Sequence, residues 1–239
     1  MATYVLVHGG GHGGWCWGRL APLLRAEGHD VHAPTLTGLG DRAHLLRPGI
    51  DLDHHISDIL AVLEFEDLSD VVLVGHSYGG MVITGVADRA PDRIGHLVYL
   101  DAASPADGQS LTDIAPALME FARSDIREVD GVELVLWPLP EMGRLYGVGD
   151  ADDLEWMQSR LTPQPLETFV QPLRLTDETA LRRIPRTDVV CISELSAVEG
   201  PQEGRSDGAQ RVWEIETGHD LMITEPQAVA EMLLKVAAL

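Results

Sequence analysis

The sequence predicts a single α/β domain with a mostly parallel, six-stranded sheet, helices on both faces and a small cap. Two observations support this fold class. Short apolar runs alternate with segments of helical periodicity, and strands separated by helices form parallel sheets that are covered on both faces. A long proline-rich segment interrupts this alternation between the fourth and fifth runs. The expected strands are residues 3–7, 30–33, 71–75, 95–100, 188–192 and 211–215.

Helical periodicity occupies the intervals between these runs. Apolar residues from Trp17 to Leu24 follow the spacing of one helix face, and Gly28 is placed to end that helix. The same spacing recurs in two further segments, 56–63 and 229–236. The near-continuous apolar character of the strands fits burial between two helical layers.

The segment 105–185 differs from the rest of the chain. It contains eight prolines and no clear strand, although residues 111–123 and 152–161 are plausible helices. An insertion of this size between two strands is expected to cover the carboxyl edge of the sheet. We therefore expect one domain, with a core formed by residues 1–104 and 186–239 and a cap insertion at 105–185.

Composition narrows the class of function. The net charge of −21 would repel phosphate backbones and anionic membranes, so neither nucleic acid nor a membrane is an expected partner. Two cysteines, Cys16 and Cys191, are too few for a disulfide framework. No apolar run approaches the roughly 20 residues of a membrane helix, and no signal-peptide pattern is visible. These features predict a cytoplasmic protein with a small-molecule partner.

The predicted nucleophile is Ser77. It stands at the centre of GHSYG at 75–79, a match to the G-x-S-x-G motif, in which a sharp turn from strand to helix exposes the serine. An apolar run at 71–74 precedes the motif and a helical segment at 78–90 follows it, as the motif requires. The turn would place the Ser77 hydroxyl at the positive end of a helix.

The predicted general base is His219. In proteins built around such a serine turn, the histidine partner comes last in chain order. His219 is the one histidine of ten that follows the predicted cap, between the last strand and a helix near 226–238. His76, beside the serine, is expected to pack within the turn.

The carboxylate that orients the histidine is open between two candidates. It should accept a hydrogen bond from the histidine Nδ1–H. Asp101 is the first residue after the strand 95–100, and Glu194 lies on the loop after the following strand. Both loops can approach His219, with Glu199 and Glu203 as further candidates.

Two backbone N–H groups are expected to bind the negative charge that develops on a carbonyl oxygen. One belongs to Tyr78, directly after the serine. The other, which we assign to Gly10, comes from the glycine-rich loop 8–15. This loop also matches a dinucleotide fingerprint, but the required acid is missing because the second strand ends in proline and threonine. We expect no cofactor and no metal.

Several stretches together resemble one branch of the α/β-hydrolases, which contains plant methyl-salicylate esterases, plant hydroxynitrile lyases and similar small bacterial esterases. The residues that carry the resemblance are VLVHG at 5–9, HGGW at 12–15, GHSYGG at 75–80, and Gly218, His219, Met222 and Pro226. The resemblance implies a Ser-His-acid triad, a small helical cap and often a homodimer.

Differences within this branch favour an esterase. The lyases carry threonine or asparagine after the first-strand histidine, and one group carries lysine after the catalytic histidine. Here those positions are Gly9 and Asp220. In the plant enzymes the acid follows the strand that matches 188–192. This position is close to Glu194, whereas Asp101 has no acidic counterpart there.

The predicted reaction is hydrolysis of a small apolar carboxylic ester through an acyl-enzyme on Ser77. Cap residues would line an apolar substrate pocket, chiefly Trp137, Met142 and Leu145. One alternative keeps the triad but changes the reaction to cyanohydrin, carbon–carbon or thioester cleavage. An alternative of another class is a non-catalytic homologue that binds a small ligand.

Overall fold

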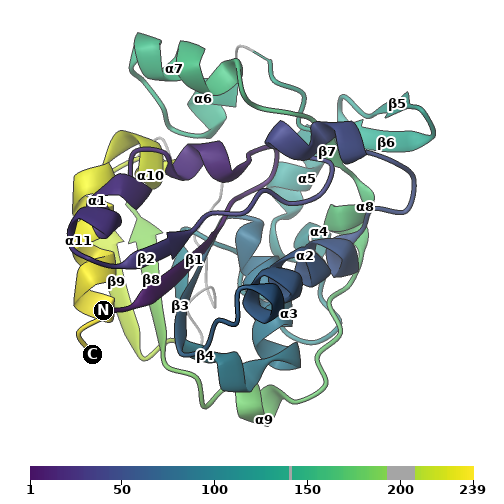
Figure 1. Ribbon diagram of the computed structural model, residues 1–239. Coiled ribbons are helices and arrows are strands. Elements are labelled where there is room, and N and C mark those ends of the chain that lie inside the picture. The colour runs from purple at the N-terminus through teal and green to yellow at the C-terminus, as the bar shows by residue number, and fades with distance from the viewer. Residues whose placement is uncertain (140–141, 193–207) are drawn as a thin grey trace.

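A computed structural model describes residues 1–139, 142–192 and 208–239 (Figure 1). Its centre is a sheet of six parallel strands in the order β2-β1-β3-β4-β8-β9. The strands are β1 (Thr3–Val7), β2 (Asp30–His32), β3 (Val71–His76), β4 (Ile94–Leu100), β8 (Arg186–Cys191) and β9 (Arg211–Ile215). All six predicted strands are confirmed, with bounds that differ by at most two residues.

The strand register brings several loops to one edge of the sheet. Val7, the last residue of β1, pairs with Gly75, and His76 at the end of β3 pairs with Leu100 at the end of β4. Because parallel strands end on the same side, the loops that follow β1, β3 and β4 emerge together there. In open α/β sheets this carboxyl edge is where ligands bind.

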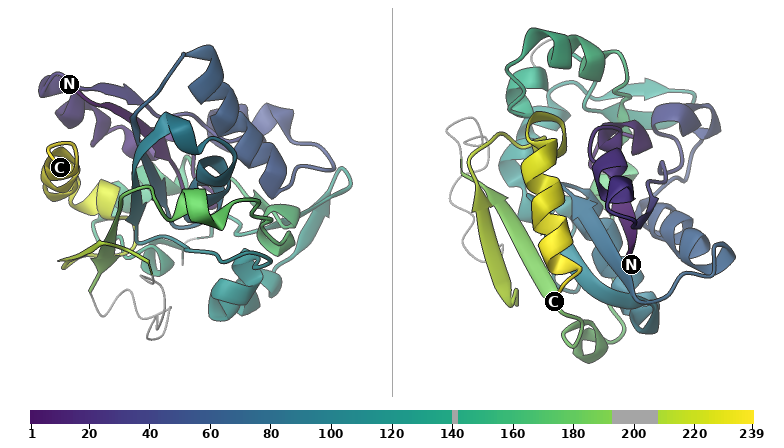
Figure 2. Two further views of the ribbon diagram at one scale, coloured as in Figure 1. Left: turned by 90° about the horizontal axis from the view of Figure 1, so that it is seen from below. Right: turned by 60° about the vertical axis from the view of Figure 1, so that its left-hand side comes forward.

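Helices cover both faces of the sheet. In Figures 1 and 2, α1 and α11 lie on one face, whereas α2 and α3 lie on the other. The core helices are η1 (Gly14–Trp17), α1 (Ala21–Ala26), η2 (Gly40–Leu45), α2 (Leu52–Phe65), α3 (Gly79–Arg89), η3 (Pro91–Arg93), α10 (Leu221–Thr224) and α11 (Pro226–Val236). The predicted first helix is divided into η1 and α1, because Pro22 begins a new helix in the first turn of α1.

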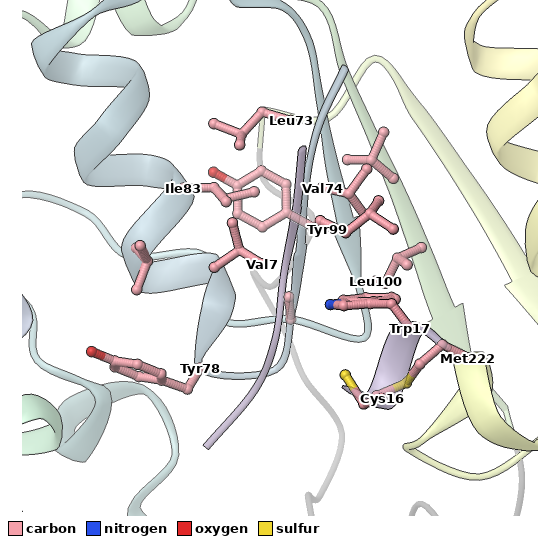
Figure 3. Close-up of a cluster of buried hydrophobic side chains, with 14 of the residues drawn as sticks. Val7, Cys16, Trp17, Leu73, Val74, Tyr78, Ile83, Tyr99, Leu100 and Met222 are labelled. Atoms are coloured by element: carbon pink, nitrogen blue, oxygen red, sulfur yellow. The ribbon is translucent and has the colours of Figure 1, made fainter. Parts of the chain in front are cut away.

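The hydrophobic core has two layers, one on each side of the sheet. Successive side chains of a strand point to opposite faces. Leu73 of β3 therefore points toward Ile83 of α3, whereas Val74 points toward Trp17 and Met222 (Figure 3). Leu73, Val74 and Trp17 are fully buried, so both helical layers are anchored to the same strand.

We call the segment between β4 and β8 the cap segment (residues 105–185). Its part with α6, α7, β5 and β6 lies above the carboxyl edge of the sheet, whereas α9 lies at the opposite end of the molecule (Figure 1). The expectation that it has no strand is wrong. It contains a small antiparallel sheet of β5 (Arg127–Val129), β6 (Val132–Val135) and β7 (Gln164–Pro165). Asp130 and Gly131 turn the β5–β6 hairpin with φ of 51° and 78°, and both residue types tolerate this left-handed conformation.

Short helices make up much of the rest of the cap segment. They are α4 (Leu111–Ile114), α5 (Pro116–Arg123), α6 (Met142–Leu145), α7 (Ala151–Gln158), α8 (Glu167–Val170) and α9 (Glu178–Leu181). The predicted helix 111–123 is interrupted at Pro116, which starts α5, and the predicted helix 152–161 corresponds to α7. The assignment of 105–185 as a cap insertion within one domain stays a prediction.

No helix within the described ranges has the length and apolar character needed to span a bilayer.

Candidate active site

Ser77 occupies a tight turn between β3 and α3. Its φ of 53° is in the left-handed region, which costs a non-glycine residue on the order of 1–3 kcal/mol. The turn is held by hydrogen bonds to the Ser77 carbonyl oxygen from the Gly80 and Ala103 N–H groups, both at 3.0 Å. The structure therefore has the strained strand-to-helix turn that the GHSYG sequence predicts.

The glycines around Ser77 are required by close backbone contacts. A Cβ atom on Gly79 would lie 2.6 Å from the carbonyl oxygen of Val7, and one on Gly80 would lie 2.0 Å from that of Ala103. Neither backbone oxygen can move far without disturbing the sheet edge. These positions exclude any side chain, which explains the glycines that follow the serine.

His219 and Asp101 meet beside this turn. The His219 Nδ1–H donates to Asp101 Oδ2 at 2.5 Å, and the Cys191 N–H donates to Oδ1 at 3.2 Å. Asp101 is buried and has a φ of 45°, so its backbone is also strained. This contact fixes the histidine tautomer and leaves Nε2 as the ring nitrogen that can accept a proton.

A second histidine ties His219 to the serine turn. The His76 Nε2–H donates to the His219 carbonyl oxygen at 2.9 Å, and the two ring centroids are 4.7 Å apart. Burial lowers the pKa of His76 to about 3, so its ring is neutral. Because His76 directly precedes Ser77, this contact places the His219 loop against the turn, and His76 packs within the turn as expected.

Of the two acid candidates, the structure brings Asp101 to His219. Glu194, Glu199 and Glu203 lie outside the described residues.

The loop after β1 lies directly against the serine. A Cβ atom on Gly9 would be 2.9 Å from the Cβ of Ser77. His8 holds this loop, because its Nδ1–H donates to the Gly9 carbonyl oxygen at 2.8 Å and its Nε2 accepts the Leu36 N–H at 3.0 Å. Gly10 follows on the same loop, and Tyr78 stands at the start of α3. Each proposed oxyanion donor is thus next in sequence to one of the two residues, Gly9 and Ser77, that meet at this point.

The predicted pocket residues lie in the cap segment with different surroundings. Met142 is buried in the core, whereas Trp137 and Leu145 are half-buried. The Trp137 ring is covered by the guanidinium of Arg127 at 4.7 Å. Their role as a substrate pocket stays a prediction.

Three other cap residues, which the sequence analysis did not select, contact the loop after β1. A Cβ atom on Gly10 would lie 2.8 Å from Phe169 Cζ and 3.4 Å from Leu136 Cδ1. The Phe169 ring also packs against that of Tyr78, with centroids 5.3 Å apart. The Tyr146 hydroxyl donates to the Gly10 carbonyl oxygen at 3.5 Å. Phe169 thus lies beside both residues that we expect to bind the oxyanion.

Among the described residues, no group of three or more histidine, cysteine, aspartate or glutamate side chains is arranged to hold a metal ion.

The chain is similar to known proteins in both sequence and structure. A model described as "Alpha/beta hydrolase family" matches residues 4–232. The chain is 40% identical to a carbendazim hydrolyzing esterase of Nocardioides sp. (strain SG-4G), over 98% of each chain. It is 30% identical to Methylesterase 2 of Arabidopsis thaliana, over 98% of this chain and 95% of the relative. An extracellular alpha/beta-hydrolase from a Paenibacillus species has a similar structure, with a TM-score of 0.82, 25% identity and 98% coverage of both chains.

Proposed function

The chain belongs to the alpha/beta hydrolase family, and on that premise we propose that it hydrolyses carboxylic esters through Ser77, His219 and Asp101. One observation carries the assignment of residues. The His219 imidazole is hydrogen-bonded through Nδ1 to a buried carboxylate and lies against the strained turn that presents Ser77. A serine, a base and an orienting acid in this relation are the components of nucleophilic acyl transfer.

The first step forms an acyl-enzyme. Ser77 Oγ attacks the ester carbonyl carbon while His219 Nε2 takes the hydroxyl proton. The Asp101 carboxylate stabilises the imidazolium without taking its proton. The C–O bond to the alcohol then breaks, and the His219 imidazolium returns the proton to the departing alkoxide. The alcohol leaves, and the acyl group stays on Ser77 as an ester.

Water completes the reaction. His219 Nε2 takes a proton from a water molecule as its oxygen attacks the acyl carbon. Collapse of the tetrahedral intermediate returns the proton to Ser77 Oγ and releases the carboxylic acid. The balance needs only ester and water, so the reaction requires no cofactor.

The N–H groups of Gly10 and Tyr78 would bind the oxyanion in both steps. Loss of one such donor typically lowers kcat by about 10²–10³-fold. The Gly10 N–H belongs to the peptide bond between Gly9 and Gly10. The orientation of this peptide bond is fixed, because the Gly9 carbonyl oxygen accepts a hydrogen bond from the His8 Nδ1–H. A donor held before the substrate arrives stabilises the transition state without reorganisation.

The residues at the two lyase-specific positions support hydrolysis over cyanohydrin cleavage. Gly9 has no side chain to donate a hydrogen bond. The residue after His219 is Asp220, a buried carboxylate bound to His12, where one group of lyases has a lysine.

The substrate class follows from the surroundings of Gly10 and from the relatives. Phe169 and Leu136 present apolar surface beside the oxyanion donors, which suits a small apolar acyl group. The relatives named for carbendazim hydrolysis and for methylester hydrolysis suggest a small alcohol as leaving group. We retain a cytoplasmic location and a homodimer as predictions. Net charge continues to argue against nucleic acid as a partner.

The test is hydrolysis of p-nitrophenyl esters from acetate to decanoate, of methyl esters and of carbendazim by the wild-type protein and Ser77→Ala. We expect activity on short-chain esters that Ser77→Ala reduces by roughly 10⁴–10⁶-fold, because the variant lacks the nucleophile. Circular dichroism of the variant controls for folding.

Two outcomes would contradict the proposal. One is a wild-type protein that is inert on every ester, and the other is a folded Ser77→Ala variant that retains activity.

A further inference from the structure

A second, fully buried histidine–carboxylate pair lies next to the proposed catalytic groups. His12 Nε2 is 3.0 Å from Asp220 Oδ2, and both side chains are completely excluded from solvent. Asp220 directly follows His219, and His12 lies two residues after Gly10. The proposed reaction uses neither residue, yet ionisable side chains are seldom buried without a reason.

The hydrogen bonds of His12 define its protonation. Its Nδ1 is 2.7 Å from the Gly10 carbonyl oxygen, and its Nε2 faces the Asp220 carboxylate. A carbonyl oxygen can only accept, and so can an ionised carboxylate, so both ring nitrogens must carry a proton. His12 is therefore an imidazolium whenever Asp220 is ionised.

The surroundings of Asp220 favour the ionised form. Burial alone would raise its pKa, but the charge and hydrogen bond of His12 lower the pKa below its usual value. The other titratable groups that face Asp220 are Cys16, His76, Tyr146 and His219.

Three of these four groups are neutral. Burial raises the pKa of the Cys16 thiol and of the Tyr146 phenol, and it lowers that of His76 to about 3. His219 is already bound to Asp101. His12 therefore supplies the counter-charge that a buried carboxylate needs.

The pair connects three segments of the site. His12 lies on the loop after β1 and binds the Gly10 carbonyl oxygen. Asp220 lies on the His219 loop, and its backbone N–H donates to the Tyr146 carbonyl oxygen of the cap segment at 2.9 Å. The Tyr146 and His12 rings are in edge contact, with centroids 4.9 Å apart. A displacement of either residue would be transmitted to both loops.

We propose that His12 and Asp220 form a buried ion pair that positions the loop of Gly10 relative to the loop of His219. The inference rests on the proposed function, because those loops carry the oxyanion donor and the general base. His12 and Asp220 are positioning residues and do not contact the substrate. A misplacement of about 1 Å at reacting groups can lower a rate by roughly 10²-fold.

The main test measures the rate at which a fluorophosphonate labels Ser77. This reagent needs the same nucleophile, base and oxyanion donors as an ester, and its use does not depend on the natural substrate. We expect Asp220→Asn and His12→Asn each to slow labelling by roughly 10²-fold. His12→Asn can still donate to the Gly10 oxygen while losing the bond to Asp220.

Asp88→Asn is the matched control. Asp88 is also a buried carboxylate, with bonds from the Thr176 and Asp177 N–H groups, but it lies at the end of α3 opposite Ser77. We expect this variant to lose thermal stability while labelling at the wild-type rate. Equal slowing in Asp88→Asn, or unchanged labelling in Asp220→Asn, would overturn the inference. A wild-type protein that is not labelled at Ser77 would instead overturn the proposed function.

A measurement on the wild-type protein tests the ion pair even if the variants do not fold. The ¹⁵N chemical shifts of the His12 ring, assigned in the wild-type protein by ring-to-backbone correlations, report whether one or both nitrogens are protonated. We expect both ring nitrogens to be protonated at neutral pH, because each faces an oxygen acceptor. A neutral His12 ring under these conditions would contradict the ion pair.

Discussion

The turn around Ser77 and the cap segment above it are built by different means. At the turn, backbone packs on backbone, and Gly79 and Gly80 leave no room for a Cβ atom. In the cap segment, side chains make the contacts beside Gly10, chiefly those of Phe169, Leu136 and Tyr146. Cap backbone also reaches the His219 loop, where the Asp220 N–H donates to the Tyr146 carbonyl oxygen. At Gly10 the cap side chains contact the loop after β1, which itself lies against Ser77.

From this difference we infer that the turn determines the rate of the reaction and that the cap segment determines the choice of substrate. Backbone geometry fixes the positions of Ser77 and of the residues that we propose as oxyanion donors, so we expect few substitutions there to be tolerated. Side-chain contacts from the cap segment set the shape beside Gly10, and such contacts can be altered without disturbing the turn. We therefore expect substitutions near the turn to change the rate, and substitutions in the cap segment to change the choice of substrate.

The largest effect is expected at the acid. Asp101→Asn should lower kcat by about 10⁴-fold, because an amide cannot stabilise the imidazolium and favours the wrong tautomer of His219. Steady-state hydrolysis of p-nitrophenyl acetate provides the measurement. Glu194→Gln is the paired variant and should remain within a few-fold of wild type. If the losses are reversed between the two variants, the acid is Glu194 and Asp101 is a structural carboxylate.

The second expected effect is a loss of folding stability in acid. It arises from buried histidines outside the cap segment. Burial lowers the pKa of His8 and of His76 to about 3, whereas the cap segment contains no histidine. Between pH 6.5 and 3 the unfolded chain therefore binds protons that the folded protein excludes. The stability that these groups contribute is fully present above pH 6.5 and is lost as the pH falls, by about 1.4 kcal/mol per pH unit for each group.

Urea unfolding of the wild-type protein and of His8→Asn at several pH values tests this expectation. The variant should show a shallower loss of unfolding free energy in acid, by about 1.4 kcal/mol per pH unit. His8 Nε2 accepts a hydrogen bond from the Leu36 N–H. If Nε2 were protonated, its N–H would face the Leu36 N–H and this hydrogen bond would be lost. Equal slopes for the two proteins would mean that His8 is not excluded from protonation in the fold.

The smallest effect is expected in the cap segment. Phe169→Leu removes part of the ring that lies beside Gly10 and Tyr78, and so enlarges the space for an acyl chain. We expect kcat/KM for longer p-nitrophenyl esters to rise roughly tenfold relative to acetate. Phe121→Leu, at an exposed site on α5, provides the control. If the two variants have the same chain-length profile, Phe169 does not contact the acyl chain.

The central sheet was predictable from the sequence because its strands are buried on both faces and appear as short apolar runs. The cap sheet was missed, although Asp130-Gly131 between Val129 and Val132 is a hairpin signal. Proline density in the segment outweighed that local turn chemistry. β7 has no signal of its own, because it consists of Gln164 and Pro165 paired with β6.

The site was partly predictable for a related reason. Ser77 and its glycines form a local motif, and chain order singled out His219. The assignment of Asp101 as the acid depends on long-range geometry, since its carboxylate is held by the Cys191 N–H from another strand. Sequence patterns also selected Trp137 and Leu145, whereas their immediate neighbours Leu136 and Tyr146 contact Gly10. Hydrophobicity alone does not tell which of two adjacent apolar residues points toward a site.

The location of the covalent intermediate tests most directly whether Ser77 is the nucleophile. The wild-type protein is mixed with p-nitrophenyl acetate, quenched in acid during the initial burst, digested and examined by mass spectrometry. We expect an acetyl group on Ser77 and none at this position in Ser77→Ala. Release of p-nitrophenol by the wild-type protein without acetylation of Ser77, or with the acetyl group on another residue, would contradict this expectation.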